Sequence, residues 1–224
     1  MNVLDKGFVK IFDYMGYDRA VIASARVSNG VTWEEASKGE EADQKLINYL
    51  MRNRHGSPFE HALFTFHVKC PIFVAREWQR HRIGSYNEIS GRYTEFKPQF
   101  YIPLAFRQPS SSNKQGSEFL EDSQADEWLE VQFSQWCGKA YDQYKYLLNM
   151  GLAKEMARMV LPINLYTEFY WTVNARSLMN FLSLRQSNDA QWEIRQYALA
   201  IKDMFKEVMP MTYGAWERNE YLAP

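Results

Sequence analysis

The densest group of chemically active side chains lies between Arg80 and Arg92, in the sequence RHRIGSYNEISGR. This segment supplies three guanidinium groups, an imidazole, serine hydroxyls, an amide and a carboxylate, and its two glycines let a ligand approach the backbone closely. Because arginine binds phosphate through paired hydrogen bonds, the segment favours a phosphorylated ligand. In the alternative interpretation, Arg80 and Arg82 complement the carboxyl end of a preceding helix and the rest is a polar surface loop. The residues alone leave both interpretations open.

A second polar cluster occupies Asn174 to Arg185, in the sequence NARSLMNFLSLR. At about 100° per residue, Arg176 and Asn180 share one helix face, whereas Arg185 projects to the opposite face. Two polar faces favour two ligands, or one ligand and a salt bridge. Arg158 stands among apolar residues in EMARMVLP, where either a carboxylate or a phosphate would serve as its anion. In the alternative interpretation, Arg185 is a cation that ends a helix and Arg176 is an ordinary surface residue.

Metal and covalent chemistry have little support. His55 and His61 do not share a helix face at their spacing, and the chain contains no HExxH pattern, so we expect no metal site. Ser57 and Glu60, with Pro58 between them, have the spacing of a helix capping box, which is a structural role.

The two cysteines also have surroundings that favour structural roles. Cys70 lies between a predicted strand and a proline, and Cys137 lies on the apolar stripe of a predicted helix. Neither has a basic partner in sequence that would produce a reactive thiolate.

The composition is that of an ordinary globular chain, large enough for one sizeable core or two small ones. Its 224 residues are 46% hydrophobic and 24% charged, and no apolar run approaches the 18 residues that would indicate a membrane span. Charges within the opening MNVLDKGFVKIFDY argue against a signal peptide, and the cysteine content fits a reducing compartment, so we expect a cytoplasmic protein. A formal net charge of −1 excludes bulk attraction to nucleic acid.

Hydrophobic periodicity predicts a mixture of helices and strands around these clusters. The expected helices run over 43–52, from Pro71 to Gly84, over 128–148, from a cap at Asn174 to about Arg185, and over 194–208. The expected strands run over 3–12, 63–69 and 163–173, with a helical turn at 57–60. The stretch 108–116 is flexible by composition and is either a hinge or a surface loop. Since there is no βαβ rhythm and no glycine fingerprint, we expect one α+β domain over 1–224, a central sheet flanked by helices of which one is long and amphipathic.

The run Arg80-His81-Arg82 followed after seven residues by Ser90 resembles the RHRX7S signature of flavin-dependent thymidylate synthases. The likeness continues in SPFEH, FTFHV, PIFVAR, SYNE, NLYT, WTVNARSL and AQWEI, in the same order, and leaves only 106–150 and the last dozen residues without informative motifs. The resemblance implies a homotetramer of α+β subunits that binds FAD and dUMP where subunits meet. It also implies that NADPH reduces FAD, that methylenetetrahydrofolate supplies the methylene carbon, and that flavin hydride completes the methyl group of dTMP.

The resemblance further implies roles for individual residues. The implied FAD contacts are Ser57, Arg80, His81, Arg82, Glu88, Asn174, Arg176 and Asn180, with Ser28 as a weaker candidate. The implied dUMP contacts are Glu77, Arg80, Glu88, Ile89, Ser90, Gly91, Arg92, Arg158 and Arg185. Arg185 would be the catalytic residue that activates the uracil, and His55 would lie near the flavin and the folate or nicotinamide site.

Two positions depart from the family pattern. Glu77 stands where the family often has Gln, and Asp189 stands where it often has His. A carboxylate at position 77 would repel phosphate unless Arg76 or Arg80 neutralised it.

Two functions of other classes remain as alternatives. One is a flavin- or nucleotide-binding regulatory protein that has lost methyl transfer, against which the intact signature and Arg185 argue. The other is an RNA-binding domain that uses Arg80, Arg82 and Arg92 with exposed aromatic residues. The net charge and the core-like spacing of the aromatic residues argue against that alternative.

Overall fold

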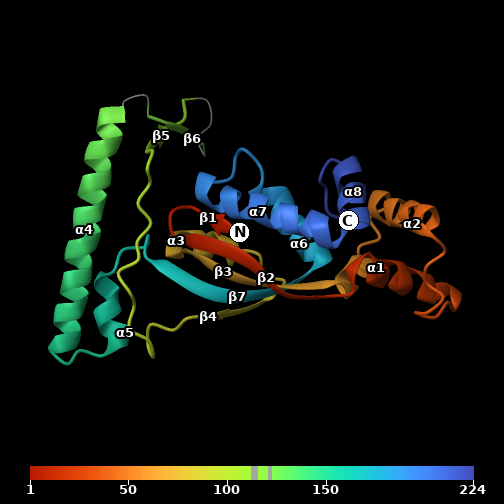
Figure 1. Cartoon of the computed structure of the whole chain (residues 1–224), viewed down its shortest axis with the longest axis horizontal. Coiled ribbons are helices and arrows are strands. Elements are labelled where there is room, and N and C mark those ends of the chain that lie inside the picture. The colour runs from red at the N-terminus through yellow and green to blue at the C-terminus, as the bar shows by residue number, and fades with distance from the viewer. Residues whose placement is uncertain (112–115, 121–122) are drawn as a thin grey trace.

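A five-stranded antiparallel sheet in the order β1-β2-β3-β7-β4 forms the centre of the molecule (Figure 1). The structure is a computed structural model that describes residues 1–111, 116–120 and 123–224. The strands of the sheet are β1 (Asn2–Val3), β2 (Gly7–Met15), β3 (Leu63–Pro71), β7 (Tyr166–Asn174) and β4 (Ser85–Glu88). On β3, Phe64, Phe66 and Val68 are buried while Thr65 and His67 are partly exposed, so the alternating sequence separates a core face from an open face.

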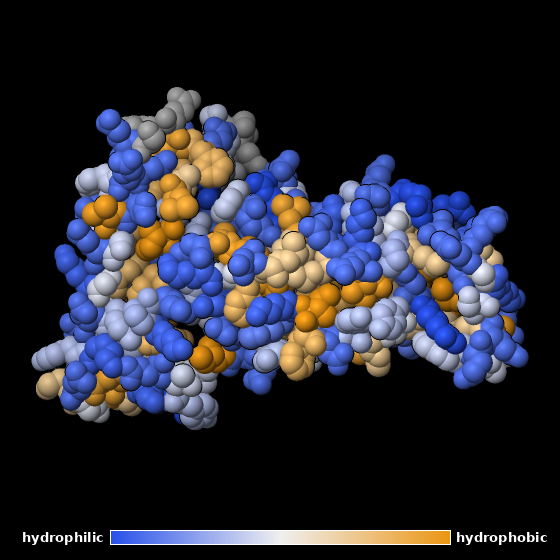
Figure 2. All heavy atoms as spheres, viewed as in Figure 1, coloured by the Kyte–Doolittle hydropathy of each residue, from blue (hydrophilic) through white to orange (hydrophobic). Residues whose placement is uncertain are grey.

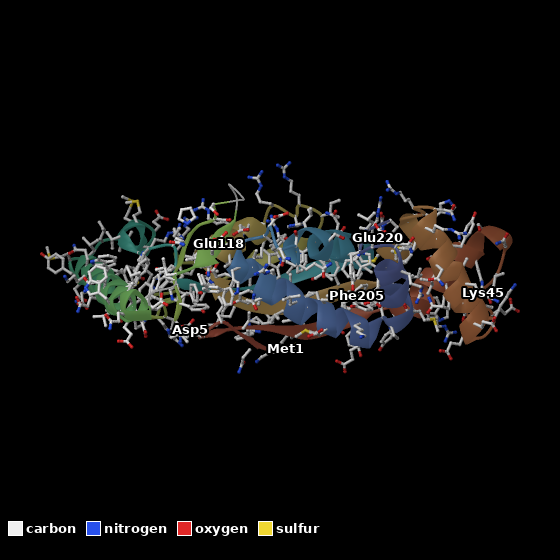
Figure 3. The ribbon with its side chains drawn as sticks, turned by 90° about the horizontal axis from the view of Figure 1, so that it is seen from above. Met1, Asp5, Lys45, Glu118, Phe205 and Glu220 are labelled. Carbon is white, nitrogen blue, oxygen red and sulfur yellow. The ribbon has the colours of Figure 1, made fainter. Side chains whose placement is uncertain are left out.

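Helices cover the core face of the sheet (Figure 1). They are α3 (Ile72–Trp78), α6 (Ala175–Arg185) and α7 (Trp192–Val208), while α8 (Pro210–Arg218) packs against α7 and α2. Phe205 of α7 lies near the middle of this layer when the molecule is seen from above (Figure 3). Trp78, Trp171 and Phe181 meet with ring centroids 5.0 to 5.4 Å apart and so join α3, β7 and α6. Because Trp78 ends α3, the residues after it must run alongside α6.

The two ends of the elongated molecule are helical. At one end, marked by Lys45 in Figure 3, α1 (Tyr17–Arg26) and α2 (Glu40–Arg52) are joined by a buried ion pair between Arg26 Nη1 and Asp43 Oδ1 at 2.8 Å. At the other end stand the long α4 (Ser123–Asn149) and the short α5 (Lys154–Ala157) (Figure 1). Within the described ranges, no helix combines the length and the apolar character needed to cross a membrane.

The open face of the sheet carries exposed aromatic side chains. Phe12 and Tyr170 are 67% and 40% exposed and contact each other edge to face, with ring centroids 5.1 Å apart. His67 stacks on Tyr170 at 4.7 Å. Exposed apolar side chains such as these mark surfaces that contact other molecules. Figure 2 looks along the edge of the sheet rather than onto its open face, and in that view hydrophobic residues also interrupt the polar surface along the middle of the molecule.

The α+β fold expected from the sequence is confirmed. The expected helices correspond to α2, α3, α4, α6 and α7, and the expected strands to β2, β3 and β7. The sequence patterns did not reveal α1 and α8. Asp18 of α1 accepts hydrogen bonds from the backbone N–H groups of Met211 and Thr212 at the start of α8, both at 2.9 Å, so the two helices are positioned by a long-range contact.

The linker-like stretch 108–116 connects two paired strands, β5 (Arg107–Pro109) and β6 (Ser117–Phe119), and its residues 112–115 lie outside the described residues. Two local predictions are wrong. Helix α3 ends at Trp78 rather than near Gly84, because the backbone N–H groups of Arg80 and His81 bond to carbonyl oxygens three residues earlier, as in a turn. The expected capping box forms no side-chain cap hydrogen bond on the 3₁₀ helix Ser57–His61, because the Glu60 carboxylate bonds to Arg176 instead.

Candidate active site

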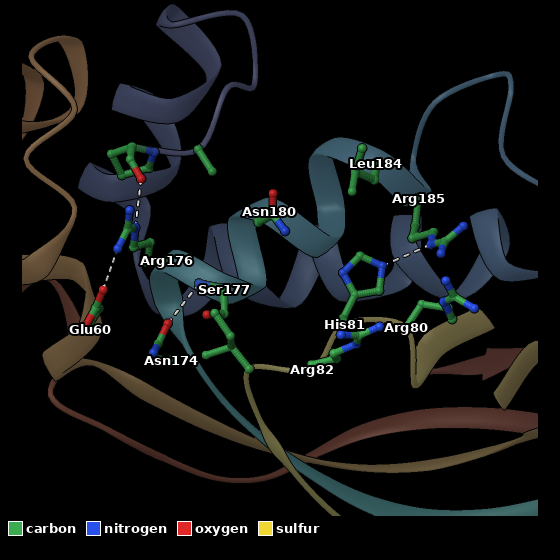
Figure 4. A pocket seen from close by; sticks show the side chains of 13 residues that line it. Glu60, Arg80, His81, Arg82, Asn174, Arg176, Ser177, Asn180, Leu184 and Arg185 are labelled. Atoms are coloured by element: carbon green, nitrogen blue, oxygen red, sulfur yellow. Dashed lines mark hydrogen bonds and ion pairs between the residues drawn. The ribbon is translucent and has the colours of Figure 1, made fainter. Parts of the chain in front are cut away.

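A pocket of about 730 Å³ opens between α6 and the chain segment that follows α3 (Figure 4). Its lining includes Arg80, His81, Arg82, Asn174, Arg176, Asn180 and Arg185, all of which were predicted site residues. It also includes residues that were not predicted: Glu60, Ile83, Ser177, Leu184, Ala223 and Pro224. The structure therefore brings the two separate polar clusters of the sequence together around one cavity.

Helix α6 supplies one wall of the pocket, and Asn174 fixes where that helix begins. Asn174 is the last residue of β7, and its side chain accepts a hydrogen bond from the Ser177 backbone N–H at 2.8 Å, as the predicted cap requires. The amino-terminal turn of α6 then opens into the pocket beside Asn174 and Arg176 (Figure 4). The positive end of the helix dipole favours an anion there.

The segment Arg80–Ile83 supplies the opposite wall. Two hydrogen bonds of the His81 backbone hold this segment in place. Its N–H donates to the Trp78 backbone oxygen, and its oxygen accepts a hydrogen bond from the Tyr86 hydroxyl at 2.8 Å. Gly84 lets the chain pass close to β7, since a Cβ there would lie 2.7 Å from Trp171 Nε1. Arg80 and Arg82 are exposed, and no carboxylate in the described part of the chain pairs with either. Two unpaired cations are thus available to a bound anion.

Arg176 crosses the mouth of the pocket between two acceptors. Its Nη1 lies 2.6 Å from Glu60 Oε1, and its Nε donates to the backbone oxygen of Pro224 at 2.8 Å (Figure 4). Gly56 lies against the same side chain. The carboxylate of Glu60 was a visible signal in the sequence but was assigned to a helix cap, and no pattern indicated that Ala223 and Pro224 line the pocket.

Arg185 ends α6 and bonds back toward α3. Its Nε donates to His81 Nε2 at 3.0 Å, its Nη1 to Glu77 Oε2 at 3.3 Å, and its Nη2 to the Glu77 backbone oxygen at 3.2 Å. Burial raises the pKa of Glu77. The positive charge of Arg185 lowers this pKa in part, and the negative charge of Glu193 raises it further. Burial and the Arg185 charge lower the pKa of His81 to about 4. This corner of the pocket holds a neutral imidazole and an ion pair.

One expectation about these residues is wrong, because the partner that neutralises Glu77 is Arg185, not Arg76 or Arg80. Arg185 lines the same pocket as Arg176 and Asn180 and also forms an ion pair, so one cavity presents both polar faces of the helix. A helix position predicts the direction of the Cβ atom, but the guanidinium lies several bonds farther out and here turns toward His81.

The remaining residues implied for dUMP form a second group outside the pocket. A Cβ on Gly91 would lie 3.0 Å from Arg158 Cδ, so these two residues are packed together. Arg92 pairs with Glu155 at 2.8 Å, in the short helix that precedes Arg158. Glu88 accepts hydrogen bonds from Gln79 and Thr167. The implied dUMP contacts that the pocket lining lacks are Glu77, which pairs with Arg185, and this second group of Glu88, Ile89, Ser90, Gly91, Arg92 and Arg158.

Four other candidate residues also lie outside the pocket lining. Ser57 begins the 3₁₀ helix that ends at His61. His55 contacts the Tyr49 ring edge to face at 5.7 Å. Ser28 bonds to the Ala25 backbone oxygen, and Asp189 donates its backbone N–H to Ser187. Roles for these residues in ligand binding stay predictions.

The cysteines have the structural surroundings that the sequence predicts. Both are free thiols and both are buried. Burial, together with the Glu88 charge, raises the pKa of Cys70, so its thiol stays protonated. Cys137 lies 3.7 Å from Asn164 Oδ1 on the side of α4 that faces the body of the protein.

Known proteins resemble the chain along its whole length. The sequence model of a family described as thymidylate synthase complementing protein matches residues 10–211. A flavin-dependent thymidylate synthase of Thermosipho africanus is 52% identical over 98% of this chain and 95% of its own length. One from Thermus thermophilus is 54% identical over 97% of this chain and 78% of its own length. The crystal structure of the UMP/dUMP methylase PolB from Streptomyces cacaoi, with 5-Br dUMP bound, is 34% identical with a TM-score of 0.88 and covers 100% of both chains.

Proposed function

The chain belongs to the flavin-dependent thymidylate synthases, and from that membership we propose that it converts dUMP to dTMP by reductive methylation. In this proposal FAD is the bound hydride carrier, NADPH is the reductant and methylenetetrahydrofolate is the carbon donor. The observation that carries the proposal is that one pocket brings several cationic groups together. Arg80 and Arg82, which have no carboxylate partner among the described residues, line it together with the amino-terminal turn of α6 and with Arg185.

The residues of the pocket fit a flavin dinucleotide. A volume of about 730 Å³ is within the range of cofactor sites, roughly 300 to 1,000 Å³. Arg80, Arg82 and Arg176 would hold its phosphates, and the amides of Asn174 and Asn180 would bind its polar edges. When bound, FAD supplies hydride chemistry that no amino-acid side chain provides. The contacts implied for Ser57, Glu88 and His55 are proposed from family membership alone.

Arg185 is the group that we assign to the uracil ring. Its guanidinium is held on one side by Glu77 and His81, which leaves further N–H donors for a ligand. A fixed cation beside the pyrimidine stabilises the negative charge that develops when N3 loses its proton. Because Glu77 shares the charge of Arg185, its carboxylate does not stand unpaired beside the nucleotide.

The second group of dUMP residues supports a site shared between subunits. Gly91 and Arg158 lie together but outside the pocket that Arg185 lines, so one chain alone does not surround a nucleotide with the whole set. The open sheet face, with exposed Phe12 and Tyr170, offers an apolar surface for a second copy. We therefore propose a homotetramer in which one subunit contributes Arg185 and a neighbour contributes Ser90 to Arg92 and Arg158.

The state of the two cysteines bears on the cellular location. Cys70 and Cys137 are free and buried, as is usual in a reducing compartment. We infer that the protein acts in the cytoplasm, without nucleic-acid or membrane partners.

The decisive experiment is release of tritium from dUMP labelled at carbon 5. The purified protein is expected to be yellow and to release tritium only with methylenetetrahydrofolate and NADPH both present, with dTMP as the product. UMP labelled in the same way serves as the competing substrate, and we expect dUMP to react faster. A flavin-free protein, or one that reduces flavin but never releases tritium, would contradict the proposal.

A further inference from the structure

His81 and Arg185 share a hydrogen bond whose direction is fixed by their chemistry. Arg185 Nε donates to His81 Nε2 at 3.0 Å. A guanidinium group has N–H donors and no acceptor, so His81 Nε2 must carry a lone pair rather than a proton. In a neutral imidazole the one remaining proton is then on Nδ1.

The surroundings of the ring keep it neutral. Burial and the neighbouring Arg185 charge lower the pKa of His81 to about 4, well below neutral pH. The Phe181 ring packs against the imidazole edge to face at 4.9 Å and adds no charge. Glu77 lies on the other side of Arg185. Its carboxylate accepts one N–H group of the guanidinium and its backbone oxygen accepts another, so the carboxylate is directed at Arg185 rather than at His81.

The protonated nitrogen faces the open part of the pocket. Figure 4 shows the second ring nitrogen of His81 turned away from Arg185, on the side of the cavity where Asn180 and Arg176 lie. No side chain or backbone group in the described part of the chain hydrogen-bonds to it. The pocket is thus presented with one N–H donor at this position.

We propose that His81 and Arg185 act as one positioning unit between the two ligand sites. Arg185 fixes the tautomer of His81, so that Nδ1–H is directed at a hydrogen-bond acceptor of the flavin. His81, through Nε2, holds the guanidinium of Arg185 in the plane that the uracil requires, and Glu77 holds its other edge. This inference rests on the proposed function, because it takes flavin and dUMP as the two ligands.

Two amide substitutions separate the functions of the two ring nitrogens. A Gln side chain places its amide oxygen near the position of Nε2 and accepts from Arg185, whereas an Asn side chain places its amide N–H near the position of Nδ1. His81→Gln is therefore expected to keep dUMP affinity within about threefold and to lower FAD affinity about tenfold, the scale of one lost hydrogen bond. His81→Asn is expected to do the reverse.

The two affinities are measured separately. FAD binding is followed by fluorescence titration of protein stripped of flavin, and dUMP binding by calorimetry with FAD in saturating excess. His61→Gln and His61→Asn are the matched controls, because His61 is exposed and outside the pocket, and both affinities should be unchanged. If the Gln and Asn substitutions at position 81 lower the FAD and dUMP affinities by equal factors, the proposed separate roles of the two ring nitrogens are wrong.

A second measurement needs no ligand. In protein labelled with ¹⁵N-histidine, the His81 signals are those absent from the His81→Gln spectrum, and they should be those of the Nδ1–H tautomer. An Nε2–H tautomer or a protonated ring at pH 7 would overturn the inference. Wild-type protein that binds neither FAD nor dUMP would instead refute the proposed function, so the two failures are distinguishable.

Discussion

Gly56 lies directly against the guanidinium of Arg176. A Cβ at position 56 would be 2.6 Å from Arg176 Cζ, closer than real Cβ atoms approach, and 3.0 Å from its Cδ. The nearest atoms that it would meet all belong to this side chain. The backbone of Gly56 has φ of −73° and ψ of −32°, a conformation that any residue adopts. Glycine at this position therefore serves the placement of Arg176 rather than the path of the chain.

Gly56→Ala should weaken FAD binding without unfolding the protein. The new methyl group displaces Arg176 from its position between Glu60 and Pro224, and the pocket loses a fixed cation. We expect FAD affinity to fall about tenfold, the scale of one charge-assisted hydrogen bond, and the melting temperature of flavin-free protein to stay the same. Fluorescence titration with FAD measures the first effect and calorimetric melting the second.

Gly138→Ala is the matched control for this substitution. Gly138 lies within α4, and a Cβ there would meet no atom within 4 Å. Alanine in a helix interior is more favourable than glycine by up to about 1 kcal/mol, so this variant should melt higher and bind FAD as wild type does. Equal FAD affinity in Gly56→Ala and Gly138→Ala would show that Arg176 does not bind the flavin.

The stability of the protein should depend on pH through His81. Its pKa is lowered to about 4 by burial and by Arg185, while the unfolded chain has a histidine pKa of about 6.5. Between these values the unfolded state binds a proton that the folded state does not, so stability is lost as pH falls from about 6.5 toward 4 and is constant above that range. These two pKa values correspond to a loss of about 2 kcal/mol between pH 7 and pH 5, and we expect about 1 kcal/mol because solvent screens a ring that is only partly buried.

Urea unfolding of wild type and His81→Gln at both pH values isolates that contribution. Other titrating groups affect both proteins equally, and the protein concentration is held fixed because assembly would shift the midpoint. The wild type should lose more stability than the variant on acidification. An equal loss in both would mean that His81 titrates normally in the folded protein.

The sequence predicts each wall of the pocket better than it predicts that the two walls lie side by side. The cap at Asn174 and the helix to Arg185 depend on local patterns, and both are confirmed. The approach of Arg80–Ile83 to α6 depends on Trp78, Trp171 and Phe181, which come from three distant parts of the chain. Aromatic content reveals that such residues are buried, but not which of them touch.

Long side chains account for the errors at the site. Glu60 fits a capping box by spacing, but its carboxylate instead reaches Arg176, which is 116 residues away in sequence. Arg185 is opposite Arg176 on a helical wheel, yet both guanidinium groups line one cavity. Pro224 contributes a backbone oxygen, and no residue-type pattern indicates which backbone atoms will face a pocket.

Arg185→Lys tests whether Arg185 is catalytic or merely ends a helix. As a helix-ending cation, it would contribute about 0.3 to 1 kcal/mol, and lysine would replace it with little effect. Lysine lacks the planar fork that bonds to His81 and Glu77 and that, in our proposal, also binds uracil. We expect dTMP formation to fall about 10²-fold or more, while NADPH still reduces the flavin at close to the wild-type rate. Stopped-flow absorbance of the flavin and tritium release measure the two half-reactions.

The outcome of that experiment has two informative alternatives. Near-normal dTMP formation by Arg185→Lys would leave Arg185 as a helix-ending cation. Equal loss of flavin reduction and of dTMP formation would indicate a damaged pocket rather than a lost uracil contact.

Mixing of inactive subunits tests the shared site. Arg158 lies outside the pocket that Arg185 lines, and we assign the two residues of one active site to different subunits. Arg158→Ala and Arg185→Ala proteins should each be inactive alone. After random subunit exchange, about one quarter of the sites should combine an intact Arg158 with an intact Arg185, since each of the two contributing subunits is of the required kind half of the time.

Arg80→Ala mixed with Arg185→Ala is the matched control for subunit exchange. Arg80 and Arg185 line the same pocket of one chain, so every pocket in that mixture lacks one of the two arginines and activity should not return. Native mass spectrometry verifies that the subunits exchange in both mixtures. Recovery in the Arg158 and Arg185 mixture alone is therefore the expected result. Absence of recovery in both mixtures, with exchange demonstrated, would place the complete site within a single chain and would require Arg158 to move toward α6 when dUMP binds.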